Sequence, residues 1–185
     1  MSEGRAAPSR VVTAGRLAAT PAEVYDRLIF FEEVRRRPPL WLGLLLPRPL
    51  RTDGPRTRPG DETRCLYRNG RLVKRVTRAV SPSSLEFEVV LQDLPIRSGV
   101  RLVGGRYALA ANGDGSTRIE IETRYEGGGR PRRLWRPIEA AVAHAFHRHL
   151  IGAIDDELES LRFVARALSI PDGNGASPLG HRPPA

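Results

Sequence analysis

The sequence has a single cysteine, Cys65, among its 185 residues. A lone cysteine cannot form an internal disulfide or a cysteine-based metal cluster, so the sequence excludes both. A cysteine nucleophile would need a nearby base, and the residues around Cys65 include none. We therefore interpret Cys65 as a small strand residue.

Long apolar runs are also missing. The longest, Leu40–Leu46, is interrupted by Gly43, whereas a membrane span needs roughly 20 apolar residues. The first ten residues are polar and lack the apolar centre of a secretory signal. We expect a cytoplasmic protein with one main domain, because this length is sufficient to bury a core.

Lysine is almost absent, since all but one of the 30 basic residues are arginine and only Lys74 is lysine. This bias is typical of a GC-rich genome, but it does not explain the net charge of +9. Such a surplus could attract nucleic acid, anionic lipid or an acidic ligand. We favour a solvated basic surface over these partners.

The pattern after Arg10 predicts one strand, then helices. Arg10–Ala18 alternates as a strand, and Thr20–Glu23 has the N-cap, proline and glutamate of a helix start. Apolar residues at helical spacing extend this helix to about Val34. Leu40–Leu46 is either a short second helix or an apolar loop. For this segment we favour core packing over a lip above a cavity or a membrane contact.

Two-residue alternation then dominates to Tyr125 and predicts an antiparallel meander of strands joined by short turns. Asn69-Gly70 predicts a hairpin turn with both residues at positive φ, and Gly104-Gly105 predicts a bulge. Arg51–Gly60 is expected to be a loop with at most a short edge strand. The predicted strands are Asp61–Arg68, Arg71–Val80, Leu85–Leu91, Val100–Ala111 and Thr117–Tyr125.

A long helix is predicted from Pro131 to about Leu168. Its apolar stripe consists of Ile138, Val142, Ala145, His149 and Ala153, and farther along the helix it shifts to Leu150, Ile154, Leu158 and Leu161. We expect three regions in the chain, namely a flexible arm (1–9), a folded domain (10–168) and a disordered tail (169–185).

Three short sequence segments, in the order in which they occur, resemble motifs of a known superfamily. They are Thr20–Tyr25 (TPAEVY), Gly60–Arg64 (GDETR) and Val76–Phe87 (VTRAVSPSSLEF). Together with the element order, the chain resembles the START-like (SRPBCC, helix-grip) superfamily, in its polyketide cyclase/dehydrase-like branch. The resemblance covers about Arg10–Arg166.

The resemblance implies an α+β helix-grip fold, in which a curved antiparallel sheet wraps around a long C-terminal helix. One or two short helices follow the first strand. Members enclose an apolar cavity that binds lipids, steroids, polyketides, quinones or plant hormones, and some catalyse cyclisation or dehydration there. The superfamily has no shared catalytic motif, so the fold alone assigns no catalytic residue.

His149 is the best candidate for an acid or base, because it lies on the predicted apolar stripe and imidazole titrates near neutral pH. Arg78 and Arg106 would reach the cavity in some strand registers. Aromatic and apolar residues on the faces that would line the cavity complete the candidate ligand pocket: Trp41, Tyr67, Phe87, Tyr107, Tyr125, Val142 and His149.

We predict no metal site and no cofactor. On a helix, His147 and His149 lie about 160° apart and cannot grip one ion, and His144 has no acidic partner at ligand spacing. An arginine cluster surrounds Trp135 where the last helix begins. Its members, Arg130, Arg132, Arg133 and Arg136, form a candidate anion patch, because cations there oppose the helix dipole.

Three functions follow as hypotheses. The leading one is binding, with or without transport, of a hydrophobic small molecule such as a lipid or polyketide between the sheet and the last helix. The second is a polyketide cyclase, aromatase or dehydratase that uses His149 as acid or base. The third is a basic module that contacts nucleic acid or anionic membrane weakly.

Overall fold

The computed structural model describes residues 7–28, 34, 36–47, 49–94, 96 and 99–168, without the side chains of residue 49 and of residues 165–168. Residues 1–6 of the predicted arm, all of the predicted tail and residues 29–33 of the predicted first helix lie outside this description.

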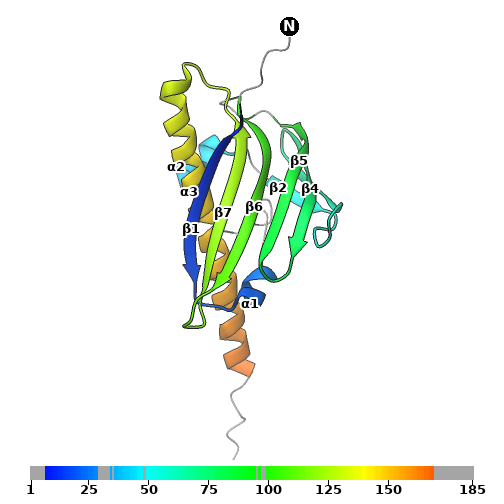
Figure 1. The fold of residues 1–185 in the computed structure, drawn as a ribbon, viewed down its shortest axis with the longest axis vertical. Coiled ribbons are helices and arrows are strands. Elements are labelled where there is room, and N and C mark those ends of the chain that lie inside the picture. The colour runs from blue at the N-terminus through cyan, green and yellow to red at the C-terminus, as the bar shows by residue number, and fades with distance from the viewer. Residues whose placement is uncertain are drawn as a thin grey trace, which may run out of the picture.

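One curved antiparallel sheet of seven strands, in the order β1-β7-β6-β5-β4-β3-β2, lies against a long helix (Figure 1). This arrangement confirms the predicted α+β helix-grip fold. The strands are β1 (Ser9–Leu17), β2 (Pro49–Asp53), β3 (Glu62–Tyr67), β4 (Gly70–Val80), β5 (Ser84–Asp93), β6 (Arg101–Ala111) and β7 (Thr117–Glu126), and the helices are α1 (Pro21–Tyr25), α2 (Leu40–Leu45) and α3 (Arg132–Leu168).

Alternation along the strands separates an inner face, which points toward α3, from an outer face of paired charges. On the outer face Arg10 of β1 reaches Glu122 of β7 at 2.7 Å. Arg75 of β4 reaches Glu62 of β3 at 2.7 Å. Such cross-strand pairs contribute little each, because both partners touch solvent.

The β3–β4 turn differs from its prediction by one position. Tyr67 pairs with Gly70, so Arg68 and Asn69 form the two-residue loop and Gly70 begins β4. Among the described residues only glycines have positive φ, which places Asn69 outside that region. Gly70 is needed for a different reason, because a Cβ there would lie 2.0 Å from the carbonyl oxygen of Asp93.

Helix α1 begins as predicted but ends sooner. Thr20 and Glu23 form the expected capping box, and Val24 is fully buried behind it. The helix ends at Tyr25 rather than continuing to residue 34, and two tight turns then place Leu28 in the core. The Leu40–Leu46 segment contains a helix, which resolves the alternative between helix and loop.

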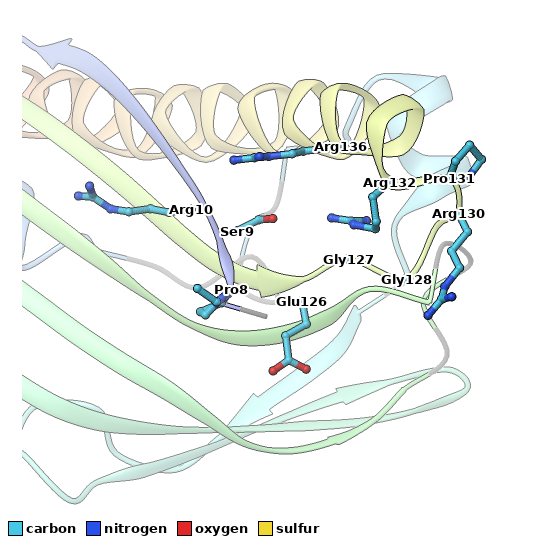
Figure 2. Close-up of a pocket in the computed structure, with 11 residues that line it drawn as sticks. Pro8, Ser9, Arg10, Glu126, Gly127, Gly128, Arg130, Pro131, Arg132 and Arg136 are labelled. Carbon is cyan, nitrogen blue, oxygen red and sulfur yellow. The ribbon is translucent and has the colours of Figure 1, made fainter. Parts of the chain in front are cut away.

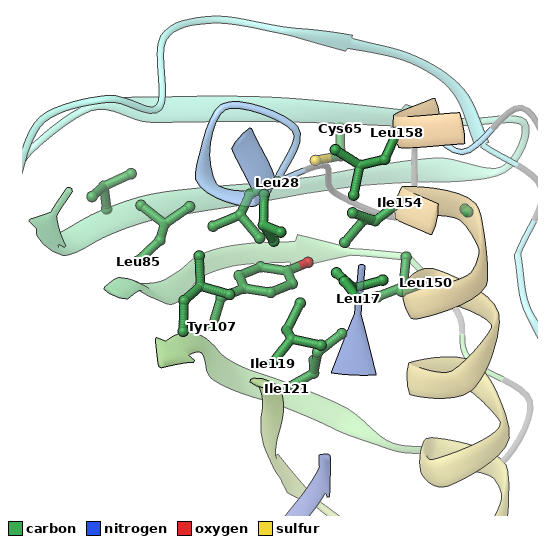
Figure 3. Close-up of a cluster of buried hydrophobic side chains, with 14 of the residues drawn as sticks. Leu17, Leu28, Cys65, Leu85, Tyr107, Ile119, Ile121, Leu150, Ile154 and Leu158 are labelled. Atoms are coloured by element: carbon green, nitrogen blue, oxygen red, sulfur yellow. The ribbon is translucent and has the colours of Figure 1, made fainter. Parts of the chain in front are cut away.

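The long helix packs its far half against the sheet. Leu150, Ile154 and Leu158 enter a core with Leu17 of β1 and Ile119 of β7 (Figure 3). These three residues of α3 belong to the second part of the predicted stripe, so the structure confirms that part apart from Leu161, which is 43% exposed. In the first part Ile138 is 52% exposed, and the buried side of the helix there passes instead through polar residues, Glu139 and His147.

Candidate functional site

Three aromatic side chains lie on the inner face of the sheet, as predicted from strand alternation. Tyr67 of β3 and Tyr107 of β6 are buried, and Phe87 of β5 is partly buried against the same cluster. The rings of Phe87 and Tyr107 are 6.5 Å apart and tilted by 38°. Gly105 makes room for this contact, because a Cβ there would come within 2.7 Å of the Phe87 ring.

A lysine joins these aromatic residues on the inner face. Lys74 lies on β4 between Leu72 and Val76, and the side chains of all three point inward and are buried. Lys74 is only 7% exposed, and its Nζ lies 5.5 Å from the centre of the Phe87 ring. The inner face thus combines aromatic surface with one cation.

A polar seam joins α3 to the two strands nearest to it. His147 is fully buried, with Nδ1 hydrogen-bonded to Thr13 of β1 and Nε2 to Thr123 of β7, each at 2.8 Å. Nδ1 of His144 also bonds to the Thr13 hydroxyl at 2.8 Å. Burial, together with the charge of His144, lowers the pKa of His147 to about 4. The His147 ring is therefore neutral near pH 7 and can donate through one nitrogen and accept through the other.

His149 points away from the sheet. His147 is fixed against β1 and β7, and a residue two positions later lies about 160° around the helix. His149 is buried on that opposite side, where burial and the charge of Arg36 lower its pKa. Its Nε2 has no hydrogen-bond partner among the described residues. This position corrects the expected orientation of His149, while its role in a site stays a prediction.

An arginine-lined cleft of about 1280 Å³ opens where β1 begins and the β7–α3 connection turns into the helix (Figure 2). Three members of the predicted anion patch line it, namely Arg130, Arg132 and Arg136, and Arg133 does not. Arg10 and Glu126 also contribute to its walls. Cations therefore dominate this end of the molecule, but no residue of the predicted ligand pocket lines the cleft.

Tyr125 is buried next to this cleft. Its hydroxyl has no hydrogen-bond partner among the described residues. Burial, and then the charge of Glu139, raise the pKa of Tyr125, and the nearby cations Arg132 and Arg136 offset part of that rise. The Ser9 side chain lowers this pKa slightly but stands outside good hydrogen-bonding geometry. Arg132 is itself held by a 2.8 Å ion pair with Glu139.

The remaining candidate residues do not join these groups. Trp41 is half exposed on α2, and Val142 is partly buried on α3. Arg78 and Arg106 are exposed, and Arg106 lies 3.7 Å from Glu86 on the outer face. The structure thus brings together the inner-face aromatics, but it separates them from Trp41.

Sequence reasoning missed Lys74 as a candidate residue. Two signals for it were present, because Lys74 is the only lysine and it alternates with Leu72 and Val76, which are apolar. The seam formed by Thr13, His147 and Thr123 had no comparable signal, since it depends on how α3 is rotated against the sheet.

The part of the chain that the structure describes contains no cluster of three or more His, Cys, Asp or Glu side chains able to hold a metal ion. None of its helices is long and apolar enough to cross a membrane.

Comparisons with solved structures find the same architecture. A START superfamily protein from Mycobacterium smegmatis has a TM-score of 0.57 at 14% identity, over 82% of this chain and 98% of that chain. A conserved protein from Geobacillus kaustophilus has a TM-score of 0.58 at 16% identity, over 82% and 96%. A putative protein of the dynemicin biosynthetic locus has a TM-score of 0.50 at 17% identity, over 81% and 47%.

No protein-family model matches the sequence, and no curated protein matches it either. The structural matches share too few residues to transfer a ligand or an activity, so they establish the architecture alone. Placement in the polyketide cyclase/dehydrase-like branch stays a prediction. The chain has the START-like, helix-grip fold.

Proposed function

We propose that the protein binds a hydrophobic small molecule that carries an acidic oxygen. Its apolar body would lie on the aromatic inner face, and its acidic group would meet the ammonium of Lys74. START-like proteins commonly bind hydrophobic ligands, which supports the general class. The position of Lys74 supports the proposal that the ligand carries an acidic group.

The position of Lys74 carries this proposal. Its side chain is buried on the aromatic inner face, and Nζ lies 5.5 Å from the centre of the Phe87 ring, whose electron-rich face attracts a cation. A positive charge therefore lies next to the apolar surface that the body of a ligand would cover. A carboxylate or enolate of the ligand would form a charge-assisted hydrogen bond with Nζ.

The surrounding side chains suit an aromatic or polyketide-like ligand body. Tyr67, Phe87 and Tyr107 offer apolar rings, and the tyrosines add hydroxyl groups that orient a ligand. The cyclase alternative has no specific observation in its favour, because its acid or base candidate, His149, lies on the side of α3 away from the sheet.

Two fluorescent probes test the role of Lys74. Anilinonaphthalene sulfonate is apolar with one negative charge, and Nile red is apolar and neutral. We expect Lys74→Met, which keeps the chain length and removes the charge, to weaken binding of the anionic probe about tenfold. Binding of Nile red should change little. Fluorescence titration measures both dissociation constants.

Arg75→Gln is the matched control. It removes one positive charge from the same strand, but on the outer face, and should leave both dissociation constants unchanged. Equal affinity of wild type and Lys74→Met for the anionic probe would refute the acidic-ligand proposal. Mass spectrometry of molecules that co-purify with the wild type would then identify the natural ligand class.

A further inference from the structure

A short helix exposes most of its apolar residues. On α2, Leu42 is fully buried, whereas Leu40 is 90% and Leu44 is 70% exposed. These two leucines are four residues apart and lie on one side of the helix. Trp41 and Leu45 lie beside them and are also exposed. Packing against the core therefore accounts for an apolar residue at Leu42, but it does not account for the exposed apolar residues on the opposite side of α2.

The first turns of α3 also carry exposed apolar residues. Leu134, Trp135 and Ile138 are exposed there, although the other side of the same helix is buried. Helix α2 contacts α3 and lies beside its N-terminal half (Figure 1). The exposed apolar residues of these two neighbouring helices are called here the two-helix apolar face: Leu40, Trp41, Leu44, Leu45, Leu134, Trp135 and Ile138.

Arginines near this face have no acidic partner in the part of the chain that the structure describes. Arg130, Arg133 and Arg136 make no ion pair with any residue that the structure describes, whereas several outer-face arginines, such as Arg10 and Arg75, are paired with glutamates. Arg133 immediately precedes Leu134, and the backbone carbonyl of Arg130 accepts a 3.1 Å hydrogen bond from Nε1 of Trp135. Arg136 instead lines the cleft near Tyr125, on the side of α3 that faces the sheet.

We propose that the two-helix apolar face docks on an anionic phospholipid bilayer. Its leucines would enter the boundary between headgroups and acyl chains, and its tryptophans would lie at headgroup level, where their amphipathic rings are favoured. Arg130 and Arg133 would contact lipid phosphates. This inference does not depend on the ligand proposed for the inner face.

Charge complementarity favours a bilayer over other occupants. A second copy related by two-fold symmetry would bring two equivalent arginine clusters into one interface, where their like charges would repel. Nucleic acid would engage the arginines but would leave the leucines without a partner. An anionic bilayer offers negative charge and an apolar interior at the same surface.

Both tryptophans of the chain lie on this face, so intrinsic fluorescence reports its contacts directly. Vesicles of phosphatidylcholine alone and of phosphatidylcholine with about 30% phosphatidylglycerol are the probes, the latter giving a negative surface of the kind that attracts basic segments. We expect a blue shift, quenching by brominated acyl chains and co-sedimentation with the anionic vesicles only.

Substitutions then locate the contact. Leu40→Ser with Leu44→Ser should lower the vesicle partition coefficient about tenfold or more, since two leucines lose their burial in lipid. Arg130→Gln with Arg133→Gln should lower it about fivefold per charge. Phe163→Ser is the matched control, because Phe163 is an equally exposed apolar residue (76%) near the other end of α3. It should bind as the wild type does.

The leucine variant should keep its fold, because both side chains are already exposed, and its far-UV circular dichroism and melting temperature check this. Three results would overturn the proposal. They are the absence of anionic vesicle binding by the wild type, equal binding by the leucine variant, and a change from dimer to monomer in that variant. The last would identify a second copy as the occupant.

Discussion

At the residue scale, His147 makes the sharpest prediction about stability. Its pKa is about 4 in the folded protein and 6.5 ordinarily, so between these values the unfolded chain binds more protons than the folded one. The free energy of unfolding should therefore fall as pH drops from 6.5 to 4. The loss attributable to His147 is roughly 2 to 3 kcal/mol. Urea unfolding at pH 7 and pH 4.5 measures it.

His147→Gln provides the comparison. Glutamine can bond to one or both threonine hydroxyls but does not titrate, so the pH dependence should become smaller by most of that amount. The pKa of His149 is lowered as well, which adds a change of the same sign. His149→Gln therefore separates the two. An unchanged pH dependence in the His147 variant would show that the seam does not titrate as the structure implies.

The seam also shows which single residues sequence reasoning can locate. Alternation predicts that Tyr67, Phe87 and Tyr107 point inward, because a strand has only two faces. The same alternation predicts that Lys74 points inward, although Lys74 is missing from the predicted ligand pocket. His147 could not be located in the same way, because its partners Thr13 and Thr123 lie on strands more than 100 residues apart in sequence. Their meeting depends on sheet order and on the rotation of α3.

At the scale of elements, helix α1 owes its position to its capping box. The Thr20 side chain accepts from the backbone N–H of Glu23, and the Glu23 carboxylate accepts from the backbone N–H of Thr20. We expect Thr20→Ala to lower the free energy of unfolding by ~1 kcal/mol. Thr20→Ser keeps the hydroxyl and should cost far less. Urea unfolding of the three proteins tests this, and equal losses for alanine and serine would exclude a capping role.

The strands and the packing side of the far half of α3 were predicted closely, and the rotation of its first half was not. Most strand bounds differ from their predictions by one or two residues, because alternation and turn residues mark both ends. On α3, hydropathy favours the side with Ile138 and Val142, since it lacks Glu139 and His147. Those polar residues are buried because Arg132, Thr13 and Thr123 satisfy them. The side of α3 that carries Ile138 and Val142 faces away from the sheet, where it contacts α2 and contributes to the two-helix apolar face.

At the scale of the whole molecule, the structure shows where the excess positive charge behind the net charge of +9 lies. Pairing neutralises many arginines on the outer face of the sheet. At the start of α3, by contrast, Arg130 and Arg136 line the cleft (Figure 2) and make no ion pair with any residue that the structure describes. The sequence predicts this arginine cluster, but it does not predict that the apolar residues of α2 lie near it. Helices α2 and α3 are far apart in the sequence and come into contact only in the folded chain. Charge and apolar surface thus meet at one end of the protein.

This juxtaposition makes vesicle binding only partly sensitive to salt. Raising NaCl from about 0.1 to 1 M shortens the screening length from ~10 to ~3 Å, which weakens the arginine contacts but not leucine burial in lipid. We expect wild-type partition into anionic vesicles to fall and then level off above that of the Leu40→Ser, Leu44→Ser variant. Co-sedimentation across this salt range measures both proteins. If both lose binding in parallel to zero, attraction between charges is sufficient to explain the contact, and the leucines do not enter the bilayer.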